Sequence, residues 1–262
     1  MWFQIKAELT YDFPKARETM LLLEAARSPD QAVHAEQLSV SPAVDIARLD
    51  DSVTGERRAV FLASGRHDIL YEATVEVLPR DGSLAGFPAT AIRDLPPEAV
   101  RFLHGSRYCP SDRFERFVRR RFGDLEGGDK VQAIVDWIAR NLDYEIGSSD
   151  SLTTAVDTFV GRAGVCRDFS HLAICLCRAA DIPARAVSAY AWKLEPADLH
   201  AVAEVYIGGR WRLIDATCKA PIEGLVRVAT GMDAADIAFM TIFGEATLVA
   251  QAFSIRDISP PG

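Results

Sequence analysis

Cys166 is the residue in this sequence best placed to do chemistry. It lies in the segment GRAGVCRDFSHLAICLC at residues 161–177, between a glycine turn and an apolar run with helical spacing. The thiol therefore stands in the first turn of an expected helix, where the exposed backbone amides favour a thiolate. Free cysteine is also among the most frequently buried residues, so taken alone this position is more typical of packing than of catalysis.

A histidine and an aspartate further along the chain offer partners for this thiol. The segment LHAVAEVYIGGRWRLIDAT at 199–217 has two alternating runs around Gly208 and Gly209, which predicts a hairpin with a two-residue loop. In that register Val202 lies opposite Asp215, and His200 is the diagonal neighbour of Asp215 on the same face. A thiol at a helix start, an imidazole and a carboxylate are the side chains that nucleophilic catalysis uses.

The other cysteines and histidines give weaker signals. Cys175 and Cys177 lie roughly 13–17 Å along the helix from Cys166, too far to share a site, and we expect them in the core. Cys218 follows the aspartate closely, and a structural role is the simpler interpretation. The remaining histidines have no spacing typical of metal ligands, and no metal or organic cofactor is expected; they are His34, His67, His104 and His171.

Several residues could assist these three. Glu204 shares the face of His200 and either joins its network or takes an exposed or ion-paired role. The backbone amide of Cys166 is the first expected oxyanion donor, and Trp137 and Tyr144 are unranked candidates for the second. For Asp168 a position in the first helical turn is sufficient explanation. Trp192 and Trp211 are as typical of a core as of a substrate groove.

The elements that must position these residues differ along the chain. Residues 3–13 and 69–77 alternate apolar and polar side chains with the period of a half-buried strand. Shorter strand candidates lie near 19–25, 32–40 and 57–64. We therefore predict a small antiparallel β domain over residues 1–95, resembling a sandwich.

The composition changes after the Gly- and Pro-rich segment near residue 90. Helices are predicted at 111–122, 129–142, 152–160 and from Cys166 to about 180, and strands at about 184–192, 200–207 and 210–216. At least one more strand, ATLVAQAFSI, follows. This order predicts an α+β fold for residues 96–262.

The overall composition excludes several classes of protein. The 262 residues are 49% hydrophobic and 25% charged, with a formal net charge of -8, which argues against nonspecific binding of nucleic acid or an anionic membrane. No apolar run reaches membrane-spanning length, and the first residues lack the pattern of a signal peptide. Five cysteines without a paired spacing fit a reducing compartment, so a cytoplasmic location is expected. The oligomeric state is left open.

The segments around the three candidate residues resemble the transglutaminase-like superfamily, in its bacterial branch. The resemblance rests on GVCRDFSHLAICLCRAADIPARAVSAY and HAVAEVYIGGRWRLIDAT, and covers residues 140–220 closely. Two positions depart from the family pattern: Val202 stands where tryptophan is common, and Ala216 where proline is common. Neither change removes a catalytic atom, although the first alters the pocket wall.

This resemblance implies a papain-like α+β core, helices packed on an antiparallel sheet, preceded by the β domain. By resemblance Cys166 is the nucleophile, His200 the general base and acid, and Asp215 its orienting partner. It implies acyl transfer at an amide or peptide carbonyl through a thioacyl-enzyme, with hydrolysis by a protease or amidase favoured over protein cross-linking. A protein-glutamine transglutaminase and a noncatalytic interaction module are the alternatives.

Overall fold

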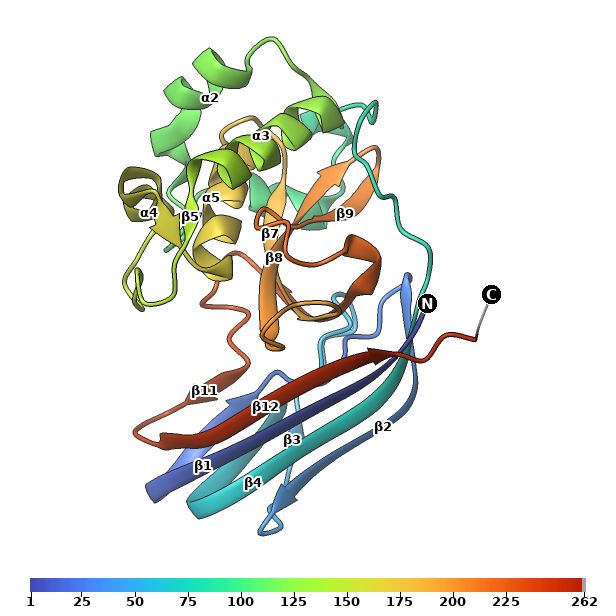
Figure 1. Cartoon of the computed structure of the whole chain (residues 1–262), viewed down its shortest axis with the longest axis vertical. Coiled ribbons are helices and arrows are strands. Elements are labelled where there is room, and N and C mark those ends of the chain that lie inside the picture. The colour runs from blue at the N-terminus through green and yellow to red at the C-terminus, as the bar shows by residue number, and fades with distance from the viewer. Residues whose placement is uncertain (261–262) are drawn as a thin grey trace.

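Alternating apolar residues build the larger of two sheets. The computed structural model describes residues 1–260, and six strands pair antiparallel in its lower part (Figure 1). Phe3, Ile5, Ala7 and Leu9 are all buried on one face of the first strand, as period-two alternation predicts. The strands are β1 (Trp2–Leu21), β2 (Gln31–Ser41), β3 (Ala47–Arg48), β4 (Ala59–Val77), β11 (Met240–Ile242) and β12 (Thr247–Asp257).

The sequence predicts a sandwich-like β domain. The structure has one sheet here, built around two long strands. The candidates near 19–25 and 57–64 are not separate strands, since they extend β1 and β4. The two long strands pair through a register shift between Phe13 and Arg17, so each strand stays continuous.

The last strand lies in a different part of the molecule from the one expected. Residues 96–262 were grouped as one core, but β12 pairs with β1 from Phe3↔Asp257 to Asp12↔Thr247, and β11 pairs with the far end of β1. Backbone hydrogen bonding along β1 therefore places the end of the chain beside its beginning (Figure 1). A local sequence pattern identifies a strand but does not specify its partner.

The upper part of the molecule confirms the predicted α+β class. Its antiparallel sheet has the order β10-β7-β8-β9. The strands are β7 (Ala184–Ala191), β8 (Leu199–Ile207), β9 (Arg210–Ile214) and β10 (Leu225–Gly231), and a short parallel pair joins β5 (Asp143–Tyr144) to β6 (Ala163–Gly164). The α-helices are α1 (Pro97–Val100), α2 (Glu115–Phe122), α3 (Gly127–Asn141), α4 (Ala155–Gly161) and α5 (Cys166–Arg178), and single 3-10 turns are η1 (Ile92–Asp94), η2 (Arg101–Leu103), η3 (Ser111–Phe114) and η4 (Ile222–Gly224).

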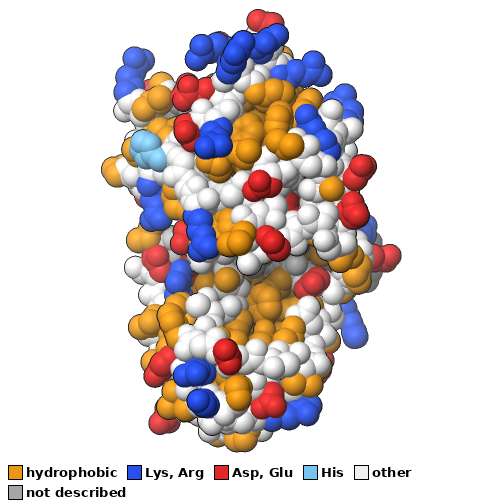
Figure 2. Space-filling model, turned by 90° about the vertical axis from the view of Figure 1, so that its left-hand side faces the viewer, with side chains coloured by type: hydrophobic (Ala, Val, Ile, Leu, Met, Phe, Trp, Pro, Cys, Tyr) orange, Lys and Arg blue, Asp and Glu red, His pale blue; other side chains and the backbone are white. Residues whose placement is uncertain are grey.

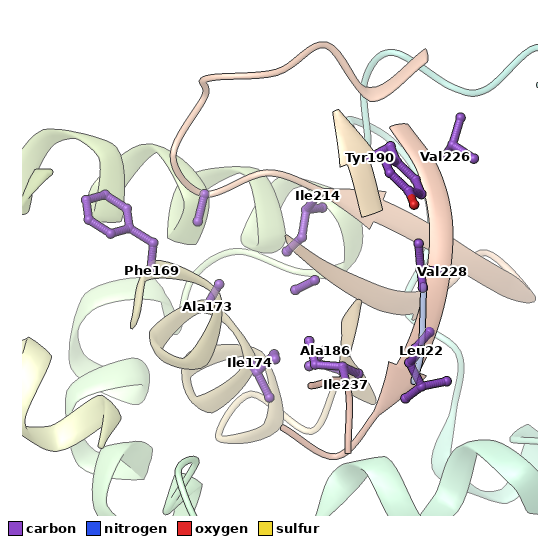
Figure 3. Packing of buried hydrophobic residues seen from close by; sticks show 14 of the residues in the cluster. Leu22, Phe169, Ala173, Ile174, Ala186, Tyr190, Ile214, Val226, Val228 and Ile237 are labelled. Carbon is purple, nitrogen blue, oxygen red and sulfur yellow. The ribbon is translucent and has the colours of Figure 1, made fainter. Parts of the chain in front are cut away.

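Helix α5 is the centre of this part. Its residues Phe169, Ala173 and Ile174 are buried, and the close-up shows them in one core with Ala186 of β7 and Ile214 of β9 (Figure 3). Cys175 and Cys177 are fully buried in α5, as expected for core residues. The packed helix thus has little freedom to move, which fixes the position of its first turn.

Buried polar groups join the lower sheet to the upper one. The Arg227 guanidinium on β10 donates to Asp30 at 2.6 Å and to Glu204 on β8 at 2.6 Å. Arg80 donates to the same Asp30 carboxylate at 2.9 Å, and Tyr190 donates to the Leu23 carbonyl at 2.8 Å. The two parts therefore share one interior instead of meeting through a flexible linker.

Basic side chains gather at the end of the molecule where α2 lies (Figure 2). Helix α2 carries four exposed arginines there, Arg116, Arg119, Arg120 and Arg121. No helix in the described part of the chain is long and apolar enough to cross a membrane.

Candidate active site

The turn before α5 fixes the Cys166 thiol at the first position of the helix. The Asp168 carboxylate accepts a hydrogen bond from the Val165 amide at 2.9 Å, which caps the helix start. Gly164 is pressed against Asp168, and a Cβ at that position would lie 2.6 Å from the Asp168 Cβ. Only glycine fits this approach, and Cys166 remains partly exposed.

The hairpin between β8 and β9 has the predicted register. Ala203 pairs with Ile214 and Ile207 with Arg210, so the same pairing continued places Val202 opposite Asp215. Gly208 and Gly209 have φ of 57° and 76°, the left-handed conformations that a two-residue hairpin loop requires. The two-residue loop and the diagonal placement of His200 and Asp215 are confirmed.

His200 and Asp215 form a buried pair. The imidazole Nε2 lies 3.1 Å from Asp215 Oδ2, and the two residues are 1% and 6% exposed. The same carboxylate accepts hydrogen bonds from the backbone amides of Thr217 at 2.9 Å and Ala220 at 3.1 Å. Burial alone would raise the pKa of Asp215, but the hydrogen bond and charge of His200, with the Thr217 donors, lower it. Asp215 is therefore ionised and oriented at neutral pH.

The other imidazole nitrogen faces the thiol. Nε2 is engaged by Asp215 and lies 3.3 Å from the Thr217 hydroxyl, while Nδ1 has no well-aligned hydrogen-bond partner among the described residues. Burial lowers the pKa of His200, but side-chain hydrogen bonding and charge from Asp215 and Cys166 outweigh it and raise the pKa to about 9. The imidazole is thus held protonated at neutral pH.

Tyr144 reaches the same place from the short strand β5. It pairs with Gly164 on β6, two residues before Cys166, and the charge of Cys166 acts on its hydroxyl. Burial, followed by the charge of Cys166, raises the pKa of Tyr144 to about 12, so the hydroxyl keeps its proton. Trp137, the other candidate oxyanion donor, packs instead between Phe117 and Phe159.

Two charged residues at the mouth of the site were not singled out from the sequence. Lys219 places its ammonium 4.3 Å from the centre of the Tyr144 ring. Asp198 lies close enough for its charge to act on both His200 and Tyr144, and burial raises the pKa of its carboxyl. In the sequence, Asp198 lies two residues before His200 and Lys219 lies four residues after Asp215. This closeness along the chain does not predict the direction in which a loop side chain points.

The remaining candidates lie outside this cluster. Glu204 is fully buried in ion pairs with Arg185 and Arg227, so the ion-paired alternative is the one observed. Trp192 packs against Phe3, and Trp211 packs against Phe102. Cys218 is exposed, with its sulfur 3.7 Å from the Asp215 carbonyl.

Among residues 1–260, no group of three or more His, Cys, Asp or Glu side chains is arranged to hold a metal ion. His200 Nε2 and Asp215 Oδ2 are instead paired with each other. What the arrangement supplies chemically is a thiol, a charged imidazole beside it and two hydrogen-bond donors at the helix start.

Comparisons with known proteins show which family and fold this chain resembles. Residues 116–216 match the family described as "Transglutaminase-like superfamily". The crystal structure of a "Putative Cysteine Protease" from Cytophaga hutchinsonii is similar over 100% of this chain and 92% of that chain, with 38% identity and a TM-score of 0.92. "Uncharacterized protein ML0607" of Mycobacterium leprae (strain TN) is 29% identical over 145 residues, which is 52% of this chain and 52% of that protein. The match thus spans about half the length of this curated relative.

Proposed function

Because this chain belongs to the transglutaminase-like superfamily, we propose that it uses the Cys166 thiol to attack an amide or peptide carbonyl and passes the acyl group to water. The observation that carries the proposal is the juxtaposition of a helix-start thiol with the buried His200–Asp215 pair. The likeness to a protein described as a cysteine protease supports hydrolysis over amine transfer.

In the proposed first half-reaction the thiolate forms a bond to the carbonyl carbon. The oxyanion accepts hydrogen bonds from the Cys166 amide and from the hydroxyl of Tyr144, which pairs with Gly164 just before the helix start. His200 then gives its Nδ1 proton to the leaving nitrogen as the C–N bond breaks, which leaves a thioacyl-enzyme and a neutral imidazole.

In the second half-reaction the neutral imidazole removes a proton from water while the water oxygen attacks the thioester. The C–S bond breaks, the carboxylic acid leaves, and the thiolate–imidazolium pair is restored. Throughout both steps Asp215 holds the ring by Nε2, so that Nδ1 always faces the sulfur. An amine that attacks in place of water would give transamidation from the same intermediate.

The test is to trap the acyl-enzyme by mass spectrometry with a diverse library of amides and peptides. We expect an adduct on Cys166, lost in Cys166→Ala, with products that gain water even when a primary alkylamine competes. Products that carry the amine would assign the chain to amine transfer. Absence of any adduct, in a folded protein whose Cys166 reacts with iodoacetamide no faster than Cys218, would support the noncatalytic module.

A further inference from the structure

Lys219 is a cation at the mouth of the site with no acidic partner. Its side chain is exposed, and within the part of the chain that the structure describes no carboxylate lies within ion-pair distance of its ammonium. The other basic side chain beside the thiol, Arg167, is neutralised by Asp168 at 2.9 Å. Lys219 is therefore a cation at this site whose charge is available to a ligand.

The backbone of Lys219 is fixed by the catalytic carboxylate itself. Its amide donates to Asp215 Oδ2 at 3.2 Å and lies 3.2 Å from the Thr217 hydroxyl. Cys218, just before it, adopts a left-handed φ of 55°, which turns the chain out of the strand. A lysine on a flexible loop would sample many positions. The backbone of Lys219 is fixed by these hydrogen bonds, which limits the positions that its ammonium can reach.

The side chain of Lys219 then runs toward the thiol. Its ammonium lies over the Tyr144 ring at 4.3 Å, and Tyr144 pairs with Gly164, two residues before Cys166. The positive charge therefore lies on the Tyr144 side of the site, next to the start of α5. The carboxyl of Asp198 acts on the His200 side of the same site and would repel an anion there.

From this arrangement we propose that Lys219 binds a carboxylate of the acyl donor, close to the amide that Cys166 attacks. The inference rests on the proposed function and specifies its substrate class. An extended peptide advances about 3.3–3.6 Å per residue, so the carboxylate belongs within one or two residues of the scissile amide. Its source is either an acidic side chain or a free C-terminal carboxylate. Since the chain has a net charge of -8, a local cation is what allows an anion to approach.

A first experiment needs no substrate. Iodoacetate and iodoacetamide have similar shapes and differ in charge, so the ratio of their alkylation rates at Cys166 measures the local potential. We expect Lys219→Met to lower the iodoacetate-to-iodoacetamide ratio about three- to tenfold at low salt, and Lys219→Arg to retain it. Lys130→Met on α3 removes the same charge elsewhere and should leave the ratio unchanged.

An unchanged ratio in Lys219→Met would overturn the proposal, as would an equal fall in Lys130→Met, because the ratio would then follow net charge alone. Iodoacetamide itself should react with Lys219→Met at a rate within about twofold of wild type. If the ratio depends on Lys219 but no amide yields a thioacyl-enzyme, the anion site stands and the proposed function fails.

A second experiment distinguishes the two sources of carboxylate. Matched peptide amides carry Asp or Asn beside the scissile amide, or end in a free carboxylate or a carboxamide. We expect the anionic member of one pair to be preferred, and Lys219→Met to raise its KM about three- to tenfold with little change in kcat. Equal effects of Lys219→Met on both members of each pair would contradict carboxylate recognition.

Discussion

At the scale of single residues, the chemistry depends on where one proton lies between Cys166 and His200. The two Asp215 carboxylate oxygens accept hydrogen bonds from the backbone amides of Thr217, Lys219 and Ala220. These bonds hold the carboxylate that orients His200. The thiol has no comparable set of partners, since it is presented by a helix start and left partly exposed. The His200–Asp215 pair is thus held rigidly, whereas the Cys166 thiol is accessible.

The His200 ring should titrate near pH 9, above its ordinary value of 6.5, because Asp215 and Cys166 stabilise the imidazolium more than burial opposes it. The resulting stabilisation of the fold is complete below about pH 6.5 and is lost as pH rises through about 9. NMR titration of the ring checks this. Cys166→Ala should lower the midpoint, and a ring that titrates near 6.5 in the wild type would contradict the assigned pair.

Asp215→Asn should reduce turnover about 10–10³-fold. If the Asn oxygen accepts from Thr217, its NH2 group faces His200 Nε2 and the amides of Lys219 and Ala220, which are all donors. The ring is then driven to the other tautomer; in a serine triad the same change costs about 10⁴ in turnover. In the proposed mechanism a thiolate–imidazolium pair forms before substrate binds, so the loss should be smaller than in Cys166→Ala or His200→Ala. Steady-state kinetics on a verified substrate measures all three.

At the scale of secondary structure elements, the β8–β9 hairpin sets the distance between His200 and Asp215. Gly209 has a φ of 76° and open space around its Cα. Gly209→Asn should be nearly neutral because asparagine tolerates the left-handed region, whereas Gly209→Val should destabilise the fold by about 1–2 kcal/mol. Urea unfolding measures the difference, and equal stabilities would mean that the loop has another conformation.

Glu204 belongs to the sheet more than to the His200–Asp215 pair. Its carboxylate links Arg185 on β7 to Arg227 on β10 with no solvent exposure. Glu204→Gln should therefore lower stability by up to about 3–5 kcal/mol, while turnover of the folded fraction falls less than tenfold. If Glu204→Gln impairs turnover more than Asp215→Asn, Glu204 is the histidine's functional partner.

At the scale of the whole molecule, the two parts should unfold together. Asp30 is held by Arg227 and Arg80, which keep the pKa of its carboxyl well below the usual range although burial opposes them. This stabilisation is present above about pH 3.8 and is lost on further acidification. Asp30→Asn should lower the free energy of unfolding by about 1–3 kcal/mol at neutral pH.

The exposed Asp45→Asn, which removes the same charge from the loop between β2 and β3, is the matched control and should have little effect. Single-tryptophan variants that retain either Trp2 in β1 or Trp137 in α3 report the two parts separately. Coincident unfolding transitions are expected in the wild type and in both Asp variants. Two separate transitions would show that the parts are independent.

The sequence by itself determined the elements and the local geometry of the site. Alternation, the Gly208–Gly209 loop and the apolar spacing after Cys166 are short-range patterns, and they correctly predicted the strands at 3–13 and 69–77, the hairpin register and α5. These features follow from the backbone preferences and burial of neighbouring residues, which a local pattern records.

Tertiary structure decided what depends on contacts between distant segments. It paired β12 with β1, enclosed Glu204 between two arginines, and placed Tyr144 rather than Trp137 at the thiol. It also laid the Lys219 side chain over Tyr144. Strand partners, ion-pair partners and the direction of a loop side chain are fixed by packing across the whole chain, and no local spacing encodes them.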